Sequence, residues 1–240
     1  MIDQTLLWKS AQHAPLMFII PGGTGSQRSQ GMPGFNIIPE YFQRRGFSCY
    51  LGETAGQDGR GGVFSLQRCL TENREAVREL IDKFDSTEVV FFGSCSGGAV
   101  ATHLAAEVDQ THTLILWETL PRYTAGSREG FIERALSKGI RLADGFLDEL
   151  VDPVDVAPKV RCPVLLFHGG DEHSHIQEED VQELAGHFTR AEEVRLVKIP
   201  GADHNLTRGS DIGLLHELLG RVEKLIEPLV RQRSGVLAER

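Results

Sequence analysis

The chain has 240 residues, which is enough for one large domain with a full hydrophobic core. Its 25 Lys and Arg against 34 Asp and Glu give a net charge of −9. This balance argues against nucleic acid or an anionic membrane as a partner, because both require a basic surface. The four cysteines include no Cys-x-x-Cys pair, and no apolar leader or membrane span is visible. We therefore expect a cytoplasmic protein with reduced thiols.

Short apolar runs alternate with amphipathic segments along the chain, which predicts an α/β fold with a mostly parallel sheet flanked by helices. Strands are expected at residues 16–20, 47–51, 89–92, 113–117, 163–167 and 194–199. Helices are expected at residues 35–45, 66–84, from about 99 to about 108, 176–188 and 212–230. Between them, residues 121–161 leave the pattern, and one or two helices over 131–150 are expected in this excursion from the sheet.

A six-residue motif, Gly93-Ser94-Cys95-Ser96-Gly97-Gly98, separates an apolar strand from a helix of small residues. A reactive residue on a sharp strand-to-helix turn needs neighbours without bulk, which the glycines of the motif supply. The helix N-terminus also favours an anion, so it favours a thiolate. These features predict Cys95 as a nucleophile. Two alternatives stay open: a shifted frame in which Ser96 is the nucleophile, and an unreactive, buried Cys95.

A cysteine nucleophile needs a base, and the base needs a group that orients it. His204 is the predicted base, because it lies in a loop directly after a strand near the C-terminus. Asp171 is the predicted acid, since it follows a Gly-Gly turn just past the strand at 163–167. The neighbouring Glu172 is the alternative acid.

The loop that holds Asp171 is also rich in histidine, with His168, His173 and His175 beside two carboxylates. Such a cluster can bind zinc. No matching pair of ligands stands elsewhere in the sequence at the right spacing. We therefore predict no metal, and the sequence indicates no cofactor.

An oxyanion requires two convergent N–H donors. The backbone of Ser96, the residue after the predicted nucleophile, is one candidate donor. The other is Gly23 in the glycine-rich turn that follows the first strand, with Thr24 next to it. Thr24 and Arg28, in the same loop, are candidate substrate-binding residues.

Together these motifs resemble the α/β-hydrolase superfamily over nearly the whole chain. The resemblance is carried by Pro21-Gly22-Gly23, the motif at 93–98, Asp171, and Gly201-Ala202-Asp203-His204, in the superfamily's order of nucleophile, acid and histidine. Pro21 stands where many members have histidine, which leaves the backbone donor intact. The cysteine nucleophile is similar to that of dienelactone hydrolases and some thioesterases. The resemblance implies a single domain over 1–240, with residues 121–161 as a cap over the active site.

The function predicted from these residues is acyl transfer through a Cys-His-Asp triad. A thioester, lactone or ester would be hydrolysed, or its acyl group transferred, through a covalent thioester on Cys95. The expected partner is a small-molecule or carrier-bound acyl substrate. A lactonase similar to dienelactone hydrolase and a non-catalytic small-molecule binding protein are the alternatives. The acyl group, its acceptor, the oligomeric state and whether Cys95 is natural or engineered stay open.

Overall fold

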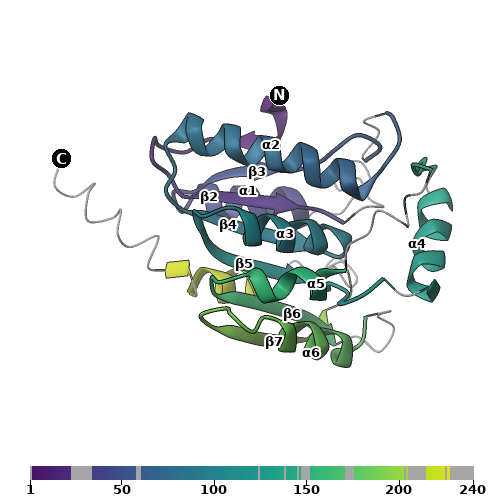
Figure 1. Cartoon of the computed structure of the whole chain (residues 1–240). Helices are drawn as coiled ribbons and strands as arrows, with labels where there is room; N and C mark the ends of the chain where they lie inside the picture. The colour runs from purple at the N-terminus through teal and green to yellow at the C-terminus, as the bar shows by residue number, and fades with distance from the viewer. Residues whose placement is uncertain are drawn as a thin grey trace.

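A computed structural model describes residues 2–22, 34–57, 61–123, 125–137, 139–144, 146, 152–170, 176–202, 204, 215–224 and 226–227. A seven-stranded sheet in the order β1-β3-β2-β4-β5-β6-β7 forms its centre (Figure 1). The strands are β1 (Leu7–Trp8), β2 (Leu16–Ile20), β3 (Ser48–Leu51), β4 (Val89–Ser94), β5 (Thr111–Trp117), β6 (Val164–Gly170) and β7 (Val194–Ala202). Only β1 runs antiparallel to its neighbour, so the predicted fold class is confirmed.

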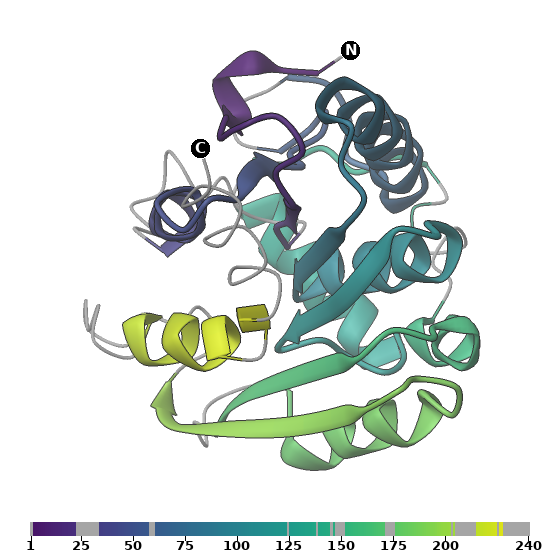
Figure 2. The same ribbon diagram turned by 90° about the vertical axis from the view of Figure 1, so that its left-hand side faces the viewer.

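Helices lie on both faces of the sheet. The helices of the described residues are α1 (Gly34–Gln43), α2 (Leu66–Phe84), α3 (Ser96–Glu107), α4 (Ala125–Ser137), α5 (Pro153–Val156), α6 (Glu178–His187) and a last helix at 215–224, and all but α4 pack near the sheet. Figure 2 shows α1 and the last helix, drawn in yellow, on the side of the sheet opposite to α2 and α3. Tyr41 of α1 donates a hydrogen bond to Glu223 of the last helix, with 2.5 Å between the oxygens.

The central strands are apolar because helices bury both of their faces. Every residue of β2 and of β4 is buried. In the register of this pair Ile20 lies opposite Gly93, so the turn after β2 meets the start of the glycine-rich motif. On the other side of β4, Ser94 lies opposite Trp117 of β5. The sheet thus brings the carboxyl ends of β2, β4 and β5 to one edge.

Several predicted boundaries differ from the structure. The strand predicted to end at Phe92 continues to Ser94, and β5 begins at Thr111 rather than 113. The prediction of one or two helices over 131–150 is confirmed for 131–137 and wrong for residues 139–144 and 146, which contain no helix; residues 147–150 lie outside the described part of the chain. Gly139, with a φ of +71°, follows α4 in a conformation that glycine adopts without strain.

Residues 121–161 leave the sheet and return to it close to their starting point. The backbone N–H of Tyr123 donates to Asp152 at 2.8 Å, which joins the two ends of this excursion. Figure 1 shows α4 apart from the helices that cover the sheet. Phe131 of α4 stacks on Phe146 at 5.2 Å between ring centroids, and both rings pack on Phe64. The assignment of this segment as a cap stays a prediction.

No helix in the described part of the chain is long and apolar enough to cross a membrane.

Candidate active site

Cys95 stands at the turn between β4 and α3 in a strained backbone conformation. Its φ and ψ are +53° and −125°, a region that residues other than glycine rarely adopt. Its N–H donates to the carbonyl of Trp117 at 2.9 Å, and its carbonyl accepts from Gly98 at 3.0 Å. Cys95 is partly exposed, whereas Ser96 begins α3 and is buried. The residue at the apex of the turn is therefore the cysteine.

The glycines around Cys95 are required by close backbone approach. A methyl group at Gly97 would collide with the carbonyl oxygens of Ile20 and Pro21, which belong to the neighbouring strand end. At Gly98 a methyl group would collide with the side chain of Thr119. The turn is thus packed between the chain segments that follow β2 and β5.

The turn after β2 lies directly beside the thiol. A Cβ built at Gly22 would be 3.0 Å from the Cβ and 3.7 Å from the Sγ of Cys95. The carbonyl of Gly22 accepts a hydrogen bond of 3.2 Å from the Gln57 side chain, whose own oxygen accepts from the N–H of Thr54 at 2.8 Å. Gln57 thereby fixes the strand end next to Cys95. The predicted Gly23, Thr24 and Arg28 lie outside the described residues.

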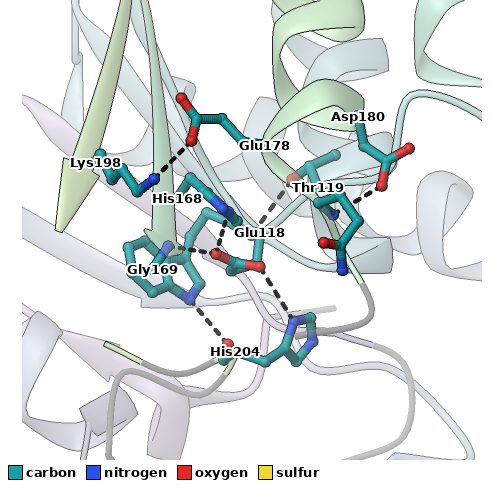
Figure 3. Close-up of polar contacts among 10 residues, drawn as sticks. Glu118, Thr119, His168, Gly169, Glu178, Asp180, Lys198 and His204 are labelled. Atoms are coloured by element: carbon teal, nitrogen blue, oxygen red, sulfur yellow. Dashed lines mark hydrogen bonds and ion pairs between the residues drawn. The ribbon is translucent and has the colours of Figure 1, made fainter. Parts of the chain in front are cut away.

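His204 and Glu118 form the second half of the site (Figure 3). Nδ1 of His204 lies 3.7 Å from Oε2 of Glu118. The other carboxylate oxygen, Oε1, accepts from the N–H of Gly169 at 2.5 Å and lies 3.0 Å from Nδ1 of His168. Glu118 is completely buried, so these groups take the place of water around its charge.

Trp117 links the two halves of the site. Its carbonyl accepts from Cys95, and its indole Nε1 donates to the carbonyl of His204 at 2.9 Å. Trp117 is 1 % exposed and packs against Phe167 of β6. One buried residue therefore fixes the backbone on both sides of the thiol–imidazole pair.

The electrostatics of the site favour a charged imidazole. Burial by itself would lower the pKa of His204, but the charges of Cys95 and Glu118 and the polar contacts of the ring with both raise it to about 10. Burial would raise the pKa of Glu118, yet the close contact with His204, the hydrogen bond from Gly169 and the charges of the nearby imidazoles lower it. His204 thus interacts with the thiol on one side and with a carboxylate on the other.

Glu118 was missed by the sequence reasoning. The available signal was an acidic residue placed directly after the buried apolar strand that ends at Trp117. The predicted acid Asp171 and its alternative Glu172 lie outside the described residues, as do His173 and His175. Within the described residues no group of three or more His, Cys, Asp or Glu side chains could hold a metal ion.

Residues 37–217 of the chain match the Dienelactone hydrolase family. The chain belongs to this family. It is accordingly a hydrolase of the α/β type, and the resemblance drawn from the motifs is confirmed at that level. A search of curated protein sequences gives no match.

Solved structures with this fold include several esterases. Est1E from Butyrivibrio proteoclasticus with bound ferulic acid is 20% identical, with 94% of each chain covered and a TM-score of 0.68. A dienelactone hydrolase from Anabaena variabilis is 17% identical, with 92% of this chain and 89% of that chain covered and a TM-score of 0.63. The Pyrococcus furiosus esterase Pf2001 is 14% identical over 91% of this chain and 81% of that one, with a TM-score of 0.68. At these identities the likeness shows the fold.

Proposed function

We propose that this hydrolase cleaves an ester, lactone or thioester through a covalent thioester on Cys95. The observation that carries the proposal is the arrangement of the strained thiol, the imidazole of His204 and the buried carboxylate of Glu118. An activated nucleophile of this kind requires a base within reach and a third group that orients the base. The positive φ of Cys95 supports the same assignment, because strained backbone is retained where function requires it.

The reaction follows from the order of these groups. Nδ1 of His204 faces Glu118, so Nε2 is the nitrogen left to take the proton of the Cys95 thiol. The thiolate then attacks the acyl carbonyl carbon. The resulting oxyanion is stabilised by the N–H of Ser96 and by the N–H of Gly23, the predicted second donor. The bond to the leaving group breaks, and the imidazolium returns its proton to the leaving oxygen or sulfur.

The second half of the reaction releases the acyl group. His204 removes a proton from water as the water attacks the thioester carbon. The carbon–sulfur bond breaks, and the thiol of Cys95 regains the proton. An acceptor other than water, entering at the same step, would give transfer instead of hydrolysis.

We assign the orienting role to Glu118 in place of the predicted Asp171. A buried carboxylate holds the imidazole in one tautomer and stabilises its charged form. The distance of 3.7 Å between Nδ1 and Oε2 is longer than a hydrogen bond, and such contacts often tighten only when substrate binds. Asp171 stays a prediction that the same experiments address.

Family membership directs the choice of substrates. Lactones related to dienelactone are the first class to test, because the family is named for their hydrolysis. Aromatic esters come second, since Est1E holds ferulic acid within the same fold. Acyl thioesters remain a third class, because a thioester intermediate is well matched to them.

The test is the intact mass of the protein after exposure to p-nitrophenyl acetate. We expect wild type to gain one acetyl group at Cys95 and Cys95→Ala to gain none. Ser96→Ala should still be acylated, which separates the two possible nucleophiles. Acylation that persists in Cys95→Ala, or that disappears only in Ser96→Ala, would overturn the proposal. The panel of lactones, esters and thioesters then identifies the substrate class by kcat/KM.

A further inference from the structure

Tyr123 carries a buried hydroxyl that the mechanism above does not use. Its side chain is 6 % exposed, and its oxygen has no hydrogen-bond partner within the described part of the chain. Buried hydroxyl groups in proteins nearly always have a partner, because an unpaired one has lost its hydrogen bonds to water. A hydroxyl kept in such a place requires an explanation.

The position of Tyr123 relates the hydroxyl to the thiol. After β5 the chain passes the turn that holds Cys95, and Thr119 packs on Gly98 of that turn. Tyr123 lies four residues after Thr119. Of the charged groups that act on the phenol and raise its pKa, Cys95 has the largest effect, followed by Asp152 and Cys69. The backbone of Tyr123 is held by Asp152 at 2.8 Å, so the ring is anchored from its own main chain.

The chemical state of the hydroxyl follows from its surroundings. Burial raises the pKa of Tyr123 well above its usual range, and the negative charges of Cys95 and Asp152 raise it further. The phenol therefore keeps its proton at neutral pH. It can donate one hydrogen bond, and the segment that carries it packs through Thr119 on Gly98, in the turn that holds Cys95.

We propose that the hydroxyl of Tyr123 donates a hydrogen bond to an oxygen of the acyl substrate bound at Cys95. This inference rests on the proposed function of Cys95 and adds a substrate-contacting residue to it. The ligand class is an acyl compound with an acceptor oxygen at or next to the reacting carbonyl, such as an ester, a lactone or a hydroxylated acyl group. Binding of that oxygen satisfies the hydroxyl that the protein leaves unpaired.

The test compares two tyrosine-to-phenylalanine variants of the full chain. Tyr123→Phe removes the unpaired hydroxyl, and Tyr41→Phe removes a hydroxyl that is paired with Glu223 on α1, a helix on the other side of the sheet. For Tyr123→Phe we expect the rate of acylation by p-nitrophenyl acetate to fall at least about tenfold, with no decrease in thermal midpoint. For Tyr41→Phe we expect the reverse: a lower thermal midpoint and an unchanged acylation rate.

The outcomes separate this inference from the proposed function. If wild type is acylated at Cys95 and Tyr123→Phe reacts at the same rate, the hydroxyl contacts no substrate and only this inference fails. A Tyr123→Phe variant that loses stability and activity together would show a structural role and would also overturn it. If wild type is not acylated at Cys95, the proposed function fails, and this inference fails with it.

Discussion

Replacing Glu118 by glutamine tests the orienting carboxylate with almost no change of shape. Oε1 of Glu118 accepts from the N–H of Gly169 and contacts Nδ1 of His168, so the single oxygen of a glutamine is best kept there. The amide nitrogen then faces His204. An amide nitrogen can only donate, so Nδ1 of His204 must become the acceptor and the ring proton moves to Nε2. This tautomer cannot take a proton from Cys95.

The expected loss is large in activity and small in stability. The same change of carboxylate to amide lowers kcat by about 10⁴-fold in serine-protease triads, where it also leaves the wrong tautomer. The hydrogen bond from Gly169 is retained. The negative charge that is lost was buried in the folded protein, so its loss also removes the cost of burying it. We therefore expect the free energy of unfolding to fall by no more than about 3 kcal/mol, the upper range for a hydrogen bond to a charged group.

The assay is the rate of Cys95 acylation, measured beside urea unfolding of the same variants. Glu178→Gln is the matched control, because Glu178 pairs with Lys198 at 2.6 Å on an exposed surface. This control should change stability by less than about 1 kcal/mol and leave acylation unchanged. Asp171→Asn should likewise retain activity. The reasoning is refuted if Asp171→Asn abolishes acylation while Glu118→Gln preserves it.

Two further predictions concern the charge and the packing of the turn. Because its folded-state pKa of about 10 lies above the unfolded value of 6.5, His204 should stabilise the fold fully below pH 6.5 and lose this effect as pH rises through about 10. In Cys95→Ala its imidazole NMR resonance should titrate at lower pH, and an unchanged titration would show that the thiol contributes nothing. Gly97→Ala should destabilise the fold by about 1–3 kcal/mol, since the methyl group meets the Ile20 carbonyl. Gly186→Ala, a helical site with open space, should stabilise it by about 0.5–1 kcal/mol, and equal thermal midpoints for the two variants would contradict this account.

The parts of the site that the sequence could predict are those encoded by contiguous residues. The turn at Cys95 is defined by glycines within three residues of it, and each of them meets a neighbour that excludes a side chain. The buried strands were predictable for a similar reason, because an apolar run without alternation is typical of a central parallel strand.

Glu118 could not be found in this way, because its role depends on long-range contacts. Nothing in the residues next to it indicates that Gly169, His168 and His204 converge on its carboxylate. The end of α4 was missed for a different reason, because the backbone leaves the helical conformation at a glycine although the apolar pattern continues. The helical pattern continues past Ser137, but Gly139 takes a positive φ and Phe64 pairs with Leu142, so the chain turns away.

The location of Glu118 has a consequence for how well the site is held. Cys95 and Glu118 follow β4 and β5, which are direct neighbours in the sheet. The N–H of Cys95 also donates a hydrogen bond to the carbonyl of Trp117, the last residue of β5. The distance between nucleophile and carboxylate is therefore set by the register of one strand pair. Groups held by sheet elements keep their geometry better than groups held by loops.

His204 is the one member of the three that follows a strand at a distance from this pair, after β7 at the edge of the sheet. The backbone carbonyl of His204 accepts a hydrogen bond from the indole N–H of Trp117, and the carbonyl of Trp117 accepts one from the N–H of Cys95. A change at Trp117 that removes only the indole N–H would release the backbone carbonyl of His204, while the contacts of the Cys95 and Glu118 backbones stay in place. The geometry of the site thus depends on Trp117, a residue that carries out no chemistry, because it joins the residue that follows the edge strand to the two that follow central strands.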